Sequence, residues 1–266
     1  MLWNELLIIA IVCAVLCAVG FYKYVYFLSI GYGFAIAGGG ITVLVLSIMN
    51  NRVGDLLWLC IVQMVLFVVY GARLSGFLLV REIKNAAYRK TLKEATGNDK
   101  KLPIFVSISI WLCVAVLYTA QVSPMLYRYA NGSKDIIVPI VGICISVCGL
   151  ILESAADKQK SAQKKVNPNM VATKGLYKIV RCPNYLGEII FWTGVFVAGV
   201  TTYASLGQWL MAIIAYICIV FIMFNGAQRL EKRQMGRYGN DKEYNDYANK
   251  TPIIIPLLPI YHLNKQ

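Results

Sequence analysis

Histidine and acidic residues are scarce in this sequence. A single histidine, His262, occurs in 266 residues, which leaves little room for a histidine-based metal centre or a catalytic triad. Only 15% of the residues are charged and 58% are hydrophobic, whereas soluble domains average about 25% charged and about 45–50% apolar residues. Strict alternation of apolar and polar residues, the mark of a half-buried strand, is also missing. The composition therefore excludes an ordinary soluble domain.

Long apolar runs are what the sequence has instead. A helix needs roughly 20 mostly apolar residues to cross a bilayer, because lipid offers no hydrogen-bond partner to an open backbone. The sequence predicts an all-α polytopic membrane protein with seven transmembrane helices, at 4–22, 25–49, 56–80, 103–127, 136–155, 186–203 and 206–225. We expect a four-helix N-terminal region, 1–135, a three-helix C-terminal region, 136–266, and a polar, helical loop between 82 and 101.

The eight cysteines are predicted to be structural. Seven of them lie inside the apolar runs, where cysteine behaves as a small buried hydrophobe. Cys13/Cys17 and Cys144/Cys148 are spaced four apart, but no histidine or further cysteine pair completes a metal-binding set beside them. We expect no metal.

Basic residues are concentrated on one side of the predicted membrane protein. Of the 26 Lys and Arg residues, 22 fall in the N-terminal turn at Lys23, the segments 81–102 and 156–185, and the tail after 228. The positive-inside rule then places the N-terminus outside and the C-terminus in the cytoplasm, as seven spans require. We expect a cell-membrane protein whose active site faces the cytoplasm.

The basic segments have two interpretations. They are explained by topology and anionic lipid headgroups, or by binding of a polyanionic ligand such as a phosphorylated cofactor. Nucleic acid is not expected, because the basic residues lie beside the spans and no recognition fold is present.

A stripe of charges ends the fifth predicted span. Glu153, Asp157, Lys160 and Lys164 follow one another at intervals of four, three and four residues, which places them on one helical face. Ionised groups near the end of a span are functional candidates. A salt-bridged helix end at the interface would give the same spacing.

A second group opens the sixth span. Pro183 suits the first turn of a helix, Asn184 and Glu188 share one face of it, and Arg181 precedes it. Free N–H groups and positive charge at a helix start favour phosphate. A structural cap is the alternative.

The third span holds Tyr70 and Arg73 on one face. A central arginine costs roughly 2.5–3.5 kcal/mol on insertion scales, so we expect Arg73 to face a polar interior in which Tyr70 acts as a hydroxyl acid. Snorkelling of Arg73 to the interface is the alternative. The polar tail after the last span has, by itself, the pattern of an amphipathic helix lying on lipid.

Three ordered motifs together carry a resemblance to a known superfamily. They are Glu153…Asp157-Lys-Gln-Lys160, then Gly175-Leu-Tyr…Arg181-Cys-Pro-Asn184-Tyr185-Leu-Gly-Glu188, then Glu231…Tyr244-Asn-Asp-Tyr247…Thr-Pro…Pro256. The pattern over 149–256 resembles the steroid 5α-reductase superfamily, in particular its uncharacterised bacterial branch.

The resemblance implies an oxidoreductase that transfers a hydride from NADPH to the C=C bond of a lipid-like enone. Tyr70 matches the tyrosine that hydrogen-bonds the substrate carbonyl, where a donor stabilises the developing enolate. The resemblance implies cofactor contacts from the later spans and the tail: Glu153, Asp157, Lys160, Lys164, Arg181, Asn184, Tyr185, Glu188, Arg229, Arg233 and Tyr247.

Three positions depart from the superfamily pattern. Cys182 and Ile179 stand where a histidine and a tyrosine are usual, and residues 25–49 lack the glutamate that steroid-active members carry. A rival class is similar in its Arg-x-Pro-x-Tyr helix start and its Glu…Tyr…Tyr…Pro tail. It comprises membrane methyltransferases of the isoprenylcysteine or phospholipid type, which use S-adenosylmethionine, and the sequence leaves it as the alternative.

Overall fold

A computed structural model describes residues 2–84, 89 and 102–264, and within these ranges every regular element is helical. The structure groups the chain into two compact units: unit 1 holds 1–140 and 198–215, and unit 2 holds 141–197 and 216–266. The division of the sequence at 135/136 stays a prediction.

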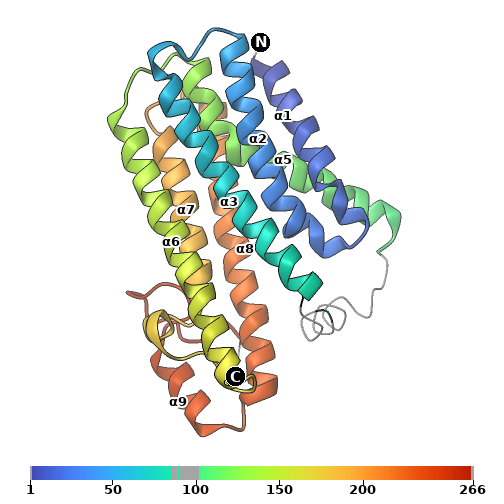
Figure 1. Ribbon diagram of the computed structural model, residues 1–266, viewed down its shortest axis with the longest axis vertical. Helices are drawn as coiled ribbons and strands as arrows, with labels where there is room; N and C mark the ends of the chain where they lie inside the picture. The colour runs from blue at the N-terminus through green and yellow to red at the C-terminus, as the bar shows by residue number, and fades with distance from the viewer. Residues whose placement is uncertain (1, 85–88, 90–101, 265–266) are drawn as a thin grey trace. The chain divides into compact units, whose positions relative to one another are not determined.

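Unit 1 is built on four long helices, α1 (Leu2–Cys17), α2 (Ile30–Met49), α3 (Leu57–Lys84) and α5 (Ile104–Ala130). Three short 3-10 turns, Ala18–Phe21, Tyr24–Leu28 and Gly54–Leu56, connect them. Helix α2 packs against α1, α3 and α5 (Figure 1). The apolar runs of the sequence thus form the helical core of this unit.

Unit 2 contains most of α6 (Ile137–Val166) and α7 (Pro183–Gly199), the second half of α8 (Leu206–Tyr238), and α9 (Lys242–Lys250), with a 3-10 turn at Gly175–Lys178 (Figure 1). Backbone meets backbone where α6 crosses α7. A Cβ added to Gly149 would lie 2.4 Å from the backbone N of Phe191, and one added to Gly187 would lie 2.7 Å from the N of Glu153. Glycine at these positions lets the two helices approach closely.

Six helical stretches among the described residues are long and apolar enough to cross a membrane: Leu2–Phe21, Ile30–Met49, Gly54–Lys84, Ile104–Ala130, Ile137–Val166 and Leu206–Tyr238. The other predicted span, 186–203, corresponds to α7, which has 17 residues and lies outside this set. The chain is therefore an integral membrane protein by its apolar helices, and the count of seven stays a prediction.

Two helices continue well beyond the apolar runs that predicted them. Helix α6 reaches Val166 and α8 reaches Tyr238, although their spans were predicted to end at 155 and 225. Arg229 and Arg233 therefore lie on the last turns of α8 and not on a separate amphipathic helix. The predicted loop helix at 82–101 falls mostly on 85–88 and 90–101, outside the described residues.

Candidate functional site

The start of α7 is held by the C-terminal segment, residues 251–264. The backbone N–H groups of Arg181 and Cys182 donate to the carbonyl oxygens of Pro252 and Ile253, both at 2.8 Å. Cys182 and Ile253 also lie in one buried apolar cluster with Ala227 and Ile254. Helix α7 begins at Pro183, as the sequence predicted. Its first turn is thus fixed by a segment some 70 residues later in the chain.

A buried ion pair joins Arg181, just before α7, to Glu231 on α8. Arg181 donates through Nη2 to Glu231 Oε1 at 2.8 Å, and only 4% of Arg181 and 1% of Glu231 are exposed. Arg181 Nη2 also donates to the carbonyl oxygen of Tyr261. Removing two charges from water is costly unless their geometry is good and further hydrogen bonds satisfy both groups. Several such hydrogen bonds surround this pair.

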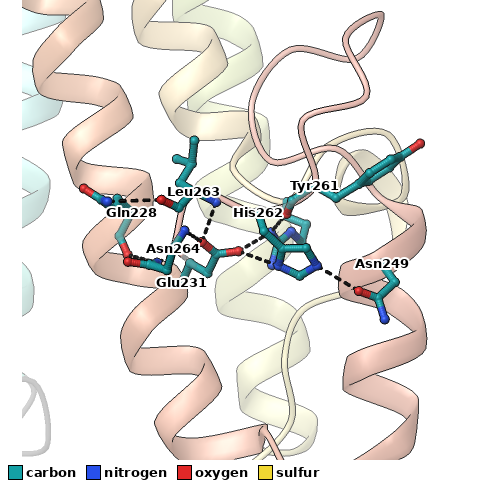
Figure 2. A network of polar contacts seen from close by, with 8 residues as sticks. Gln228, Glu231, Asn249, Tyr261, His262, Leu263 and Asn264 are labelled. Atoms are coloured by element: carbon teal, nitrogen blue, oxygen red, sulfur yellow. Dashed lines mark hydrogen bonds and ion pairs between the residues drawn. The ribbon is translucent and has the colours of Figure 1, made fainter. Parts of the chain in front are cut away.

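Glu231 is the centre of that polar network (Figure 2). Its Oε2 accepts from the backbone N–H of Leu263 at 2.9 Å and of Asn264 at 3.1 Å, and from Asn264 Nδ2 at 2.9 Å. His262 Nδ1 lies 3.0 Å from Glu231 Oε1, while its Nε2 lies 2.8 Å from Asn249 Oδ1. The predicted cofactor contact Arg181 thus has its charge matched by Glu231, and the C-terminal segment is anchored on the same carboxylate.

Lys164 is likewise held by the protein. Its Nζ donates to the carbonyl oxygens of Pro168, at 3.1 Å, and Met170, and to the hydroxyl of Tyr238 at 3.2 Å. The ammonium also lies 5.6 Å from the centre of the Tyr238 ring. Lys164 therefore closes the turn after α6 against the end of α8.

Two glutamines on α6, Gln159 of the first motif and Gln163, organise the loop that leads to α7, and neither was among the candidate site residues. Gln163 Oε1 accepts from the backbone N–H groups of Thr173 and Lys174, both at 3.0 Å, and Gln159 Oε1 accepts from that of Leu176 at 2.8 Å. Gln159 and Gln163 are four residues apart, next to Lys160 and Lys164 on the helix. That spacing was the available signal, because side chains four apart lie on one face.

Two tyrosines close the loop against α9. The hydroxyl of Tyr247 donates to the carbonyl oxygen of Tyr177 at 2.6 Å, and the hydroxyl of Tyr177 donates to that of Ala156 at 3.3 Å. Burial raises the pKa of both phenols, and nearby Asp157 raises that of Tyr177 further. Both hydroxyls are therefore neutral donors at physiological pH.

Charged side chains from α6 and α8 act on the first turn of α7. Tyr185 on this turn packs against Gly226 of α8 and interacts electrostatically with Asp157, Arg229 and Arg233. Burial raises the pKa of Cys182, which directly precedes α7, to about 12, and the positive charge of Lys160 opposes this rise. Asp157, Lys160, Arg229 and Arg233, predicted from separate motifs, thus gather around one helix start.

These four residues are more exposed to solvent than the buried Arg181. Arg229 and Arg233 are exposed, and Asp157 and Lys160 are half-buried. Arginines four apart on an exposed helix face are well suited to the oxygen atoms of phosphate. The exposed Arg229 and Arg233 and the half-buried Lys160 are cations at this helix start, and we call them the cationic cluster.

Two buried carboxylates complete the predicted set in unit 2. Glu153 is 5% and Glu188 4% exposed. Trp192 Nε1 donates to Glu188 Oε1 at 3.1 Å, while Glu153 lies against Gly187 at the α6–α7 crossing. Asn184 is half-buried on the first turn of α7.

The predicted catalytic residue Tyr70 belongs to unit 1, where it is fully buried on α3. The rings of Tyr70 and Tyr32 form a T-shaped pair with their centroids 5.9 Å apart, and the rings of Tyr32 and Tyr118 stack with their centroids 4.8 Å apart. Arg73, one turn further along α3, is only half-buried. Tyr70 therefore lies in an aromatic layer formed by α2, α3 and α5.

The donor set of unit 2 fits a phosphorylated dinucleotide. Exposed arginines suit phosphate, and neutral phenol and amide groups suit the polar edges of ribose or a base. Within the described residues, no group of three or more His, Cys, Asp and Glu side chains is arranged to hold a metal ion.

A family model described as "Protein of unknown function (DUF1295)" matches residues 34–251, which is most of the chain. The chain belongs to this DUF1295 family. The family is part of the steroid 5-alpha-reductase-like superfamily. The matched range of this DUF1295 protein includes each candidate residue from Tyr70 to Tyr247 and ends at residue 251, before the residues Tyr261 to Asn264 that contact Arg181 and Glu231.

Two relatives show how similar known proteins are to this chain and how much of its length they match. An uncharacterised protein of Schizosaccharomyces pombe is 28% identical over 138 residues, which are 48% of this chain and 46% of that protein. The chain thus spans about half the length of that relative. A protein of Gossypium hirsutum named Steroid 5-alpha-reductase DET2 is 23% identical over 191 residues, 70% of this chain and 69% of its own length. No solved structure matches.

Proposed function

We propose that this DUF1295 protein is a membrane-embedded oxidoreductase that uses NADPH to reduce the C=C bond of a lipid-like enone. Membership of the steroid 5-alpha-reductase-like superfamily supports the reaction class, and apolar helices suit a lipid substrate. The observation that carries the proposal is the cationic cluster, in which α6 and α8 place Lys160, Arg229 and Arg233 around the start of α7. Such a cluster suits the phosphates of a dinucleotide.

The residues of unit 2 take distinct parts in the proposal. Arg229, Arg233 and Lys160 hold the phosphates, and Asn184, with Tyr185 beside it, contacts the cofactor from the first turn of α7. Arg181 and Lys164, whose donors are engaged within the protein, position the segments that carry these residues. When bound, NADPH supplies the hydride.

On the substrate side, we propose that the hydroxyl of Tyr70 donates to the carbonyl oxygen of the enone. A neutral hydroxyl placed there stabilises the negative charge that develops on this oxygen as the β-carbon accepts hydride. The buried position of Tyr70 supports this part, because a water-excluded setting strengthens such a hydrogen bond.

We further propose that the chain crosses the membrane seven times, with α7 as the shortest crossing, the N-terminus outside and the C-terminus in the cytoplasm. The basic residues on α6, α8 and the loops next to them support this topology through the positive-inside rule.

Ligand-dependent thermal stability decides between the two cofactor classes. Purified protein should be stabilised by NADPH, approaching about 2.7 kcal/mol at a hundredfold excess over Kd, and unaffected by S-adenosylmethionine. Asn184→Ala and Asp157→Ala should reduce the NADPH effect, while Tyr70→Phe should preserve it and slow turnover. Lys232→Gln, an exposed neighbour on α8, is the control. Stabilisation by S-adenosylmethionine alone would reject the reductase in favour of the methyltransferase.

A further inference from the structure

The C-terminal half of α5 passes through the interior of unit 1. Every residue from 118 to 129 is buried, so its polar side chains must find partners within the protein. Six of them do: Tyr118 donates to Phe27, Thr119 to Ala115, Ser123 to Ala120, Tyr127 to Met211, Arg128 to Asp135 and Ala198, and Tyr129 to Gln63.

Gln121 is the exception within this stretch. Only 3% of it is exposed, and neither Oε1 nor Nε2 has a hydrogen-bond partner among the described residues. A side-chain amide carries two N–H donors and an oxygen acceptor. Burying these groups without hydrogen-bond partners destabilises the folded protein. A bound molecule that hydrogen-bonds the amide would remove this cost.

The position of Gln121 connects it with the aromatic layer. It lies one helical turn after Tyr118, and residues three apart are neighbours on a helix surface. The ring of Tyr118 stacks on that of Tyr32, which in turn forms a T-shaped pair with the ring of Tyr70. The amide therefore belongs to the same interior region of unit 1 as the hydroxyl assigned to the substrate carbonyl.

The chemistry of the surroundings defines the partner. Gln121 is uncharged, and the cation nearest along its face of α5 is Arg128, two turns further on. The Nη1 of Arg128 donates to the carbonyl oxygen of Asp135 at 2.6 Å and its Nη2 to that of Ala198 at 2.9 Å. A carboxylate ligand would have to compete with these bonds, whereas a ketone or hydroxyl group requires no counter-charge.

We infer that the side-chain amide of Gln121 binds an oxygen atom of an uncharged, oxygenated lipid within unit 1. The inference rests on the proposed function only in identifying this lipid as the substrate. An amide at this point distinguishes a lipid with an oxygen from a hydrocarbon of the same shape, because the hydrocarbon would leave the amide unmatched.

The test compares two ligands of one shape in three proteins. Binding of cholest-4-en-3-one and of the hydrocarbon cholest-4-ene is measured in lipid nanodiscs, without NADPH, for wild type, Gln121→Leu and Gln63→Leu. Gln63 is the matched control, a buried glutamine on α3 whose Oε1 accepts from Tyr129 at 2.9 Å.

Wild type should bind the enone about tenfold more tightly than the hydrocarbon, the size expected of one good hydrogen bond. Gln121→Leu should weaken this preference, because only the Tyr70 hydroxyl then remains for the carbonyl oxygen, and it should keep its thermal stability, since it removes only an unmatched amide. Gln63→Leu should keep the preference and melt at a lower temperature, because Tyr129 loses its acceptor.

Three results would overturn the inference: a preference as large in Gln121→Leu as in wild type, no preference in wild type, or a loss of thermal stability in Gln121→Leu equal to that of Gln63→Leu. The last would mean that an internal water holds the amide. Failure of the proposed function is separate, since it appears as an absence of NADPH stabilisation while the enone preference persists.

Discussion

Replacing Glu231 by glutamine removes one charge from a buried network and keeps its shape. Arg181, 4% exposed, would lose the carboxylate with which it forms an ion pair. A glutamine also offers one oxygen where Glu231 offers two, so its NH2 group would face either the Arg181 side or the N–H groups of Leu263 and Asn264. Removing one member of a buried pair costs about 3–5 kcal/mol, and we expect Glu231→Gln to fall in this range.

Cys182 offers a local readout of this change. Its thiol is 2% exposed, and its backbone N–H donates to Ile253 of the C-terminal segment. Opening that segment exposes the thiol, so maleimide labelling, quantified on the Cys182 peptide by mass spectrometry, measures the opening free energy. A loss of 3 kcal/mol corresponds to labelling more than about a hundredfold faster.

Lys232→Gln provides the control, because it changes the adjacent exposed residue of α8 and should alter stability by no more than about 0.5 kcal/mol. Labelling of Glu231→Gln within about fivefold of wild type would refute the account of the network. So would equal acceleration by Lys232→Gln, because a general effect of charge on α8 would then explain both.

Two further predictions concern packing and pH. Gly149→Val should lower the thermal stability by about 1–3 kcal/mol or more, because its side chain meets the α7 backbone, whereas Gly76→Ala, with open space around it, should leave stability unchanged or raise it slightly; equal effects would argue against the close crossing. Burial raises the pKa of Cys182 from 9.0 to about 12, so the folded state favours the protonated thiol. Its contribution to stability is therefore complete below pH 9 and is lost as pH rises from about 9 towards 12. Denaturation of wild type and Cys182→Ala between pH 8 and 10.5 should show the steeper loss in wild type, and parallel curves would contradict it.

Local pattern was enough to predict part of this fold. Pro183 marked the start of α7 because proline fits the first turn of a helix, and the apolar runs located the long helices. Their ends were misjudged at α6 and α8, since hydropathy follows the apolar part of a helix and not its continuation into polar surroundings. The charge spacing that continued past 155 already fitted a longer α6.

The roles of the charged residues could not be deduced in the same way. Spacing identified Arg181 as a candidate but could not distinguish a ligand contact from a buried ion pair, because its partner Glu231 is 50 residues away. His262, set aside as a lone histidine, bonds that same carboxylate. The first contact depends on how the start of α7 packs beside α8 and the second on the return of the C-terminal segment, and no local signal encodes either.

Calorimetric titration of NADPH measures whether the cationic cluster binds a phosphorylated dinucleotide. Wild type should bind NADPH with an affinity that falls as salt concentration rises. The double variant Arg229→Gln/Arg233→Gln should bind at least about tenfold more weakly, and Lys232→Gln should bind as wild type does. No binding heat with wild type, or equal affinity in the double variant, would contradict binding at the cationic cluster.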